Sequence, residues 1–159
     1  ITNIKIFIEY HFGKRKPLLN FFLNEQAILP SNIQEVEKLQ YQTKCVYTFD
    51  AVLNDKNILK ITMDDKNDHD LLYIGNDCVD HYAKVREFEI DEIKSEQALH
   101  KCSTFTHSMS DEWVEHMKTK GIEILPVYKN GTEIRLNGTM ELKFSLPFWQ
   151  WQIENGYGL

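Results

Sequence analysis

Two Asn-Gly pairs divide the β-favouring stretch from 122 to 146 and constrain the fold more than any other feature: Asn130-Gly131 and Asn137-Gly138. Asn-Gly tolerates the positive φ angles of tight hairpin turns, so each pair predicts a chain reversal. A two-residue turn at the first pair places Val127 opposite Ile134 on an apolar face. One extra residue at the second pair places Ile134 opposite Leu142 and opposes unlike charges on the other face. The stretch therefore predicts a three-stranded antiparallel meander over about 122–146, with five side chains buried on one face: Ile134, Leu136, Met140, Leu142 and Phe144.

The composition is that of an ordinary globular domain, since 42% of the 159 residues are hydrophobic and 26% are charged. A chain of this length buries about 70% of its unfolded surface without disulfide or metal support. Residues 1–12 alternate apolar and polar side chains and include charges, which predicts a strand and not a signal peptide. No apolar run approaches the ~20 residues that cross a bilayer, so we expect no membrane partner.

Periodicity predicts the remaining elements of a single α+β domain, residues 1–159, built on antiparallel sheets. Residues 43–53 and 57–63 keep apolar side chains at odd positions, which predicts a second hairpin with an odd-numbered loop. Another strand is expected at 85–90. Start and stop signals predict three to four short helices, over 18–23 (with a buried strand as the alternative), 31–41, 91–101 and 111–120. The apolar stripe of the last helix is expected to pack on the meander. The aromatic tail, 147–153, predicts a short helix or an extended strap that closes the core.

The three cysteines, Cys45, Cys78 and Cys102, are an odd and sparse set for a disulfide framework. We therefore expect buried thiols and a cytoplasmic protein. The spacings Cys78-x-x-His81 and His100-x-Cys102 can place ligands on one zinc ion. The second pair lies in a predicted helix, however, where side chains at i and i+2 diverge, so no metal site is predicted.

Acidity is concentrated in the middle of the chain. The formal charge is −6, and residues 50–96 alone hold 13 acidic and 6 basic residues, a net charge of −7. Exposed acids steer association with basic surfaces, and tyrosine is enriched at interface hot spots. We expect the aspartates largely on one exposed side, with Tyr73 either as the anchor of an interface or as a core residue of a short strand. The predicted partner-binding residues are Asp64, Asp65, Asp68, Asp70, Tyr73, Asp77 and Asp80.

Motifs for catalysis and cofactor binding are missing from the sequence. It contains neither a Gly-x-Ser-x-Gly elbow nor a phosphate-binding glycine loop, and the aspartates from 64 to 70 lack the glycine and glutamate of an EF-hand. Lys14-Arg15-Lys16 is the only basic cluster, which disfavours nucleic-acid binding. We therefore predict no catalytic residue, no cofactor, no bound metal and no nucleic-acid partner.

A small acidic domain without catalytic motifs is similar in kind to bacterial toxin-immunity proteins, a resemblance of class that carries over no residue. It implies a cytoplasmic antitoxin that binds a basic protein partner, such as a nuclease-type toxin, by covering its cationic groove. Two alternatives stay open. One is a metal-dependent or hydrolytic enzyme whose site is assembled from residues distant in sequence, and the other is a structural or viral assembly module that associates through the aromatic tail.

Overall fold

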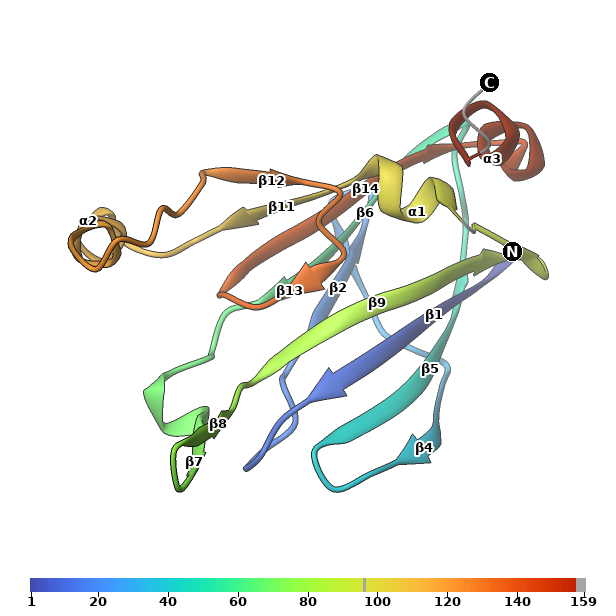
Figure 1. Cartoon of the computed structure of the whole chain (residues 1–159). Helices are drawn as coiled ribbons and strands as arrows, with labels where there is room; N and C mark the ends of the chain where they lie inside the picture. Colours follow the sequence, from blue (N-terminus) through green and yellow to red (C-terminus); the bar gives the residue numbers. More distant parts are fainter. Residues whose placement is uncertain (96, 157–159) are drawn as a thin grey trace.

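The computed structural model describes residues 1–95 and 97–156, which form two facing antiparallel sheets (Figure 1). The first sheet has the strand order β10-β9-β1-β5-β4, and β13 pairs with β9 further along that strand. Its strands are β1 (Thr2–His11), β4 (Asn32–Lys38), β5 (Gln42–Ala51), β9 (Tyr82–Ile90), β10 (Ile93–Lys94) and β13 (Glu133–Ile134).

The second sheet has the order β12-β11-β14-β6-β2-β3. Its strands are β2 (Asn20–Leu23), β3 (Gln26–Ile28), β6 (Lys56–Met63), β11 (Ser103–His107), β12 (Val127–Lys129) and β14 (Gly138–Ser145). Two further strands, β7 (Leu72–Ile74) and β8 (Asp77–Val79), pair only with each other. The chain thus forms a single α+β domain dominated by antiparallel sheets.

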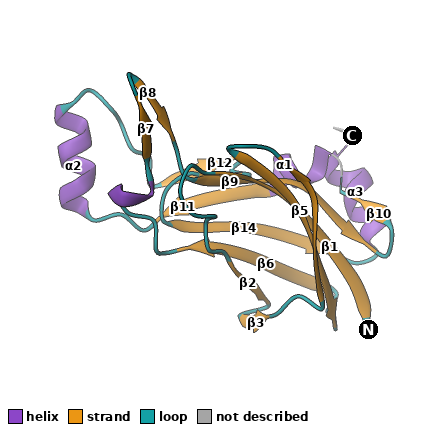
Figure 2. Ribbon diagram, turned by 90° about the horizontal axis from the view of Figure 1, so that it is seen from below, coloured by secondary structure: helices purple, strands orange, loops and turns teal. Residues whose placement is uncertain are grey.

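The helices lie at the two ends of the sandwich (Figure 2). At one end α2 (Asp111–Thr119) lies near the β7–β8 hairpin, which follows the short 3-10 helix η1 (Asp68–Asp70); at the other end are α1 (Gln97–Cys102) and α3 (Phe148–Gly156). No helix among the described residues has both the length and the apolar character that a membrane span requires.

The core lies between the sheets and continues under α3. Alternate residues of β1, from Ile4 to Tyr10, are fully buried, as the period of two in a strand requires. Under α3, the ring of Phe144 lies 5.2 Å from that of Phe88 between centroids, and Phe148 stacks on Trp151 at 5.3 Å. The prediction that the aromatic tail closes the core is therefore confirmed for Trp151, whereas Trp149 is 55% exposed.

The predicted meander over 122–146 is wrong in its pairing. β12 pairs with β11, β13 with β9, and β14 with β11 and β6, so the three segments are divided between two sheets. Asn130 does adopt a positive φ of 57°. Gly131, however, packs so closely on β11 that a Cβ there would lie 2.6 Å from the backbone nitrogen of Phe105. The turn therefore carries the chain from one sheet to the other.

The side chains predicted to form the apolar face of the meander are buried or partly buried, but the strands that carry them belong to two different sheets. Ile134, Met140, Leu142 and Phe144 are buried, and Leu136 is partly buried against the core. Ile134 belongs to the first sheet and Leu142 to the second, so the two side chains approach the core from opposite sides. Alternation thus predicted which side chains are buried but not which strands pair.

Two predicted helices are strands. Residues 18–23 hold β2, the alternative left open for this segment, and residues 31–41 hold β4. Ser31 does not cap a helix, because its backbone N–H donates to the carbonyl of Thr48 at 2.8 Å and its hydroxyl donates to the same oxygen. Pairing with β5 overrides the local capping signal.

The segments 43–53 and 57–63 do contain strands with buried odd-numbered side chains. They are not a hairpin, because β5 pairs with β1 and β4 while β6 pairs with β14 and β2. The strand expected at 85–90 is the end of β9. The helix expected over 91–101 forms only as α1; residue 96, within that expected range, lies outside the described residues.

Helix α2 begins and ends as predicted. The Ser110 hydroxyl accepts a hydrogen bond from the backbone N–H of Trp113 at 3.1 Å, and Gly121 follows the helix with a φ of 79°. The expected packing on the meander is wrong, because no residue of α2 is buried. Helix α2 extends away from the sandwich (Figure 1).

Candidate partner-binding site

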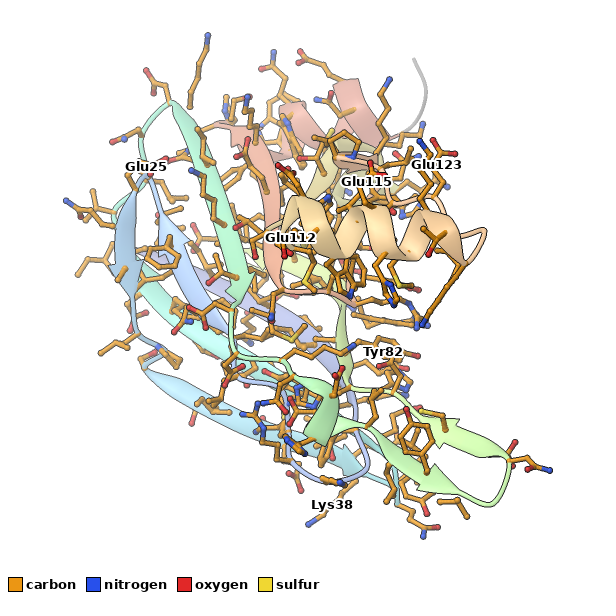
Figure 3. All side chains as sticks on the ribbon, turned by 90° about the vertical axis from the view of Figure 1, so that its left-hand side faces the viewer. Glu25, Lys38, Tyr82, Glu112, Glu115 and Glu123 are labelled. Carbon is orange, nitrogen blue, oxygen red and sulfur yellow. The ribbon has the colours of Figure 1, made fainter. Side chains whose placement is uncertain are left out.

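The β7–β8 hairpin protrudes from one end of the molecule, below α2 in Figure 3. Its strands pair Leu72 with Val79 and Ile74 with Asp77, and the turn between them contains Gly75 at a φ of 60°. Tyr73, the predicted anchor, is 69% exposed on β7. The alternative of a core position for this tyrosine is therefore wrong.

A single arginine holds the base of the hairpin. The guanidinium of Arg15 donates two hydrogen bonds to the carboxylate of Asp70, from Nε to one oxygen at 2.6 Å and from Nη2 to the other at 2.9 Å. Its Nη1 also donates to Asp65 at 2.9 Å, and Nη2 donates to the backbone carbonyl of that residue. Asp70 is only 3% exposed, and its paired guanidinium lowers its pKa to about 2. Such bidentate contacts fix orientation as well as charge.

An asparagine just before β14 makes a further attachment. The side-chain amide of Asn137 donates to the carbonyl of Lys66 and accepts from its N–H, both at 2.9 Å. Gly13 packs directly against Leu72 of β7, so closely that a Cβ at position 13 would clash with the Leu72 side chain. The segment before the hairpin is thus attached to the β1–β2 connection and to the start of β14.

The six predicted aspartates divide into two groups of three. Asp65, Asp70 and Asp80 form ion pairs within the chain: the first two with Arg15, and Asp80 with Lys66 at 2.8 Å. Asp70 is buried and so does not fit the expectation of an exposed acidic side. The other group is exposed and forms no ion pair with any described residue: Asp64, Asp68 and Asp77.

Helix α2 adds acids at the same end of the molecule. Glu112 and Glu115 are exposed on α2, and Figure 3 shows them on the upper side of that helix, with the hairpin below it. The charge count of residues 50–96 could not include them, because they come from a later part of the chain. Their position depends on where the β11–β12 connection places the helix.

His81 is a buried group that the sequence did not reveal. It is 0% exposed, neither ring nitrogen has a hydrogen-bond partner among the described residues, and Nε2 lies 3.9 Å from a carboxylate oxygen of Asp70. Burial lowers its pKa, because the charged imidazolium is poorly solvated there. The Cys78-x-x-His81 spacing drew attention to this residue only as a zinc ligand.

The two Cys/His spacings considered for zinc, and rejected in the sequence, lie in different environments. Cys78 is exposed on β8 while His81 is buried, and His100 is exposed on α1. Within residues 1–95 and 97–156, no three histidine, cysteine or acidic side chains are grouped to hold a metal ion. All three cysteines are free thiols; Cys45 is buried, but Cys78 is exposed, so the expectation of buried thiols is wrong there.

A cavity of about 540 Å³ lies between the β12–β13 turn and the neighbouring strands. Charged side chains from distant parts of the chain line it, among them Lys66, Asp80 and Arg135, together with the apolar side chains of Phe105 and Leu136. Sequence reasoning missed this cavity because its walls come from both sheets. No periodic pattern or motif connects these residues.

Comparison of the chain with protein-family models, with curated proteins and with solved structures found no match in any of the three. The chemistry of the surface is therefore what points to a function. The protruding hairpin and the cavity are the two features that this chemistry singles out.

Proposed function

We propose that this chain is a binding protein that inhibits a cationic partner protein through its β7–β8 hairpin. Its sharpest form is a bacterial toxin-immunity protein that covers the nucleic-acid groove of a nuclease-type toxin. The observation that carries the proposal is the 69% exposure of Tyr73 on a protruding hairpin beside three unpaired acids. Aromatic anchors within polar rims are typical of interface hot spots.

Attachment of the hairpin base supports this role. A loop that must be ordered on binding loses conformational entropy, at a cost of about 0.5–1.5 kcal/mol for each immobilised side chain. Here the Arg15–Asp70 pair and the Asn137 amide already hold the segment before β7. Tyr73 is therefore presented on a preformed support, which reduces the entropy lost on binding.

Electrostatics supports a basic partner. Asp64, Asp68 and Asp77 have no cation to neutralise them within the described chain, and Glu112 and Glu115 lie at the same end. Unpaired acids of this kind raise association rates with a cationic surface more than they raise affinity. We place this interaction in the bacterial cytoplasm, where three free thiols stay reduced.

The test is affinity capture with the immobilised wild type and four immobilised variants, followed by quantitative mass spectrometry of the retained proteins. Two forms alter the hairpin: Tyr73→Ala, and the triple variant Asp64→Asn, Asp68→Asn and Asp77→Asn. Two are matched controls at the opposite end: Trp149→Ala on α3, and the triple variant Asp55→Asn, Glu92→Gln and Glu154→Gln.

We expect wild type and both controls to retain the same basic protein, and both hairpin variants to lose it. With that protein purified, Tyr73→Ala should weaken binding by about 2 kcal/mol, or roughly 30-fold in Kd. A partner that all forms retain equally, or one that is acidic, would rule out the hairpin as the binding surface.

A further inference from the structure

The cavity under the β12–β13 turn is built from an unusual arrangement of charge. Five charged side chains form a continuous alternating row: Lys66, Asp80, Arg135, Glu133 and Lys84. Successive charged groups lie 2.8, 3.8, 2.7 and 3.4 Å apart. Four of these five side chains line the cavity and Lys84 does not; together with Lys129 the lining holds three basic and two acidic side chains, one positive charge in excess although the whole protein carries −6.

Further donors face the same cavity. Lys129 lines it and forms no ion pair within the described part of the chain, and the exposed imidazole of His100 lies on its rim. The ammonium of Lys66 uses two of its three hydrogens, on Asp80 and on the carbonyl of Arg135 at 2.6 Å. One hydrogen of that ammonium therefore remains for a ligand.

Part of the cavity lining is apolar. Phe105 and Tyr128 contribute aromatic side chains and Leu136 an aliphatic one. A volume of about 540 Å³ with apolar walls and a few convergent polar groups is typical of small-molecule sites.

The cavity is also held in shape. Gly131 donates its N–H to the carbonyl of Ser103 at 3.0 Å, which attaches the turn to β11. Arg135 stacks on the ring of Tyr82, 3.8 Å from its centroid, and His11 stacks on that ring at 4.5 Å. Two planar groups this close must occupy opposite faces of the ring. The guanidinium is thus oriented before any ligand arrives.

We propose that this cavity binds a small organic anion, with a carboxylate or phosphate head on Lys66, Lys129 and Arg135 and a flat apolar body against Phe105 and Tyr128. The excess positive charge favours a ligand with a carboxylate or phosphate group, and the aromatic side chains favour a ligand with a flat apolar ring. Arginine and lysine are the residues that recognise both kinds of head group. This site is separate from the hairpin surface and does not depend on the function proposed for it.

The probes are phenyl phosphate, benzoate and inorganic phosphate, with benzyl alcohol as the neutral control. Each is titrated to about 10 mM, in the range of weak small-ligand affinities, while amide shifts are followed by NMR. We expect saturable shifts at Phe105, Gly131 and Thr132 with phenyl phosphate or benzoate, and at least about tenfold weaker binding of benzyl alcohol. Inorganic phosphate has the anionic head group but no aromatic ring, so it should bind more weakly than phenyl phosphate. The difference measures the contribution of the ring to binding.

Three variants complete the test. Arg135→Gln and Lys129→Gln should each weaken the aromatic anions by about tenfold. The exposed Lys143→Gln, outside the cavity, should leave binding unchanged. Because Lys129 is exposed and forms no ion pair with any described residue, its variant keeps the fold even if the Arg135 change disturbs the row of ion pairs. The proposal is overturned by an absence of saturable shifts, by shifts that map elsewhere, by equal binding of benzyl alcohol, or by equal losses in the Lys143 variant.

Discussion

The carboxylate of Asp70 is held by Arg15, which lies 55 positions earlier in the chain. Sequence reasoning noted the basic turn around Arg15 and the acids around Asp70, but nothing in either pattern connects them. Exposure of Tyr73 was one of two alternatives that the residues left open. At the scale of single residues, the sequence therefore identified candidates, whereas their roles depend on partners that only the fold brings together.

The Arg15–Asp70 pair predicts sensitivity to acid. The unfolded chain protonates Asp70 near 3.8 and the folded chain only near a pKa of about 2, so the stability from this pair is present above pH 4 and is lost as pH falls towards 2. Asp70→Asn should remove that slope and lower the free energy of unfolding at pH 7 by at most about 2 kcal/mol, and by less because the Arg15 side chain is 39% exposed. Urea unfolding at pH 7, 4 and 3 measures both effects. An Asn variant with wild-type stability and an unchanged slope would show that the pair does not stabilise the hairpin base.

Burial of His81 predicts a second pH dependence of the free energy of unfolding, in a higher pH range than that of Asp70. The unfolded chain protonates this imidazole near 6.5, whereas burial lowers its folded pKa, so stability should fall as pH drops through about 6.5. His81→Phe removes two unpartnered buried nitrogens and should raise the free energy of unfolding by about 1 kcal/mol, with a larger gain at pH 5.5 than at pH 8. The exposed His116→Gln is the control and should leave the free energy of unfolding at pH 8 within about 0.5 kcal/mol of wild type. A less stable Phe variant at both pH values would mean that His81 has a favourable interaction that its geometry does not reveal.

At the scale of elements, alternation was a good guide to burial and a poor guide to pairing. Buried positions on β5 and β6 have the predicted parity, yet the two strands belong to different sheets. The Asn130-Gly131 turn likewise connects β12 to β13 without pairing them. Local signals fix which face of a strand is apolar, but a sandwich offers two sheets that can cover that face. Because local patterns do not show which sheet a strand joins, they also could not predict the cavity, whose lining residues come from both sheets.

Phe144 on β14 tests the aromatic cluster under α3. Its ring contacts Phe88, Phe148 and Trp151, and its side chain is buried. Phe144→Ala should cost about 3–5 kcal/mol, because it removes a large side chain from a packed site that cannot fully collapse. Trp149→Ala, an exposed aromatic change on α3, should cost less than about 1 kcal/mol. Chemical denaturation of both variants gives the comparison; equal losses would mean that the cluster does not hold α3 to the sheets.

At the scale of the whole molecule, the two ends of the sandwich differ in the elements and side chains that they carry. One end carries α1 and α3 over the aromatic core, and the other carries α2, the hairpin and the unpaired acids (Figure 2). Half of the predicted acidic patch is neutralised inside the chain. The charges left for a partner are therefore those of Asp64, Asp68 and Asp77, and α2 at the same end of the molecule adds Glu112 and Glu115.

The central claim is tested most directly by the association rate of the partner retained in affinity capture, measured at low and high salt. For wild type, raising salt from about 0.05 to 0.5 M should slow association by roughly tenfold or more and leave dissociation almost unchanged. The variant with Asp64, Asp68 and Asp77 changed to Asn should associate slowly at low salt and lose most of this salt dependence, while Tyr73→Ala should mainly speed dissociation. If the triple variant keeps the wild-type association rate and salt dependence, the hairpin end is not the surface that meets the partner.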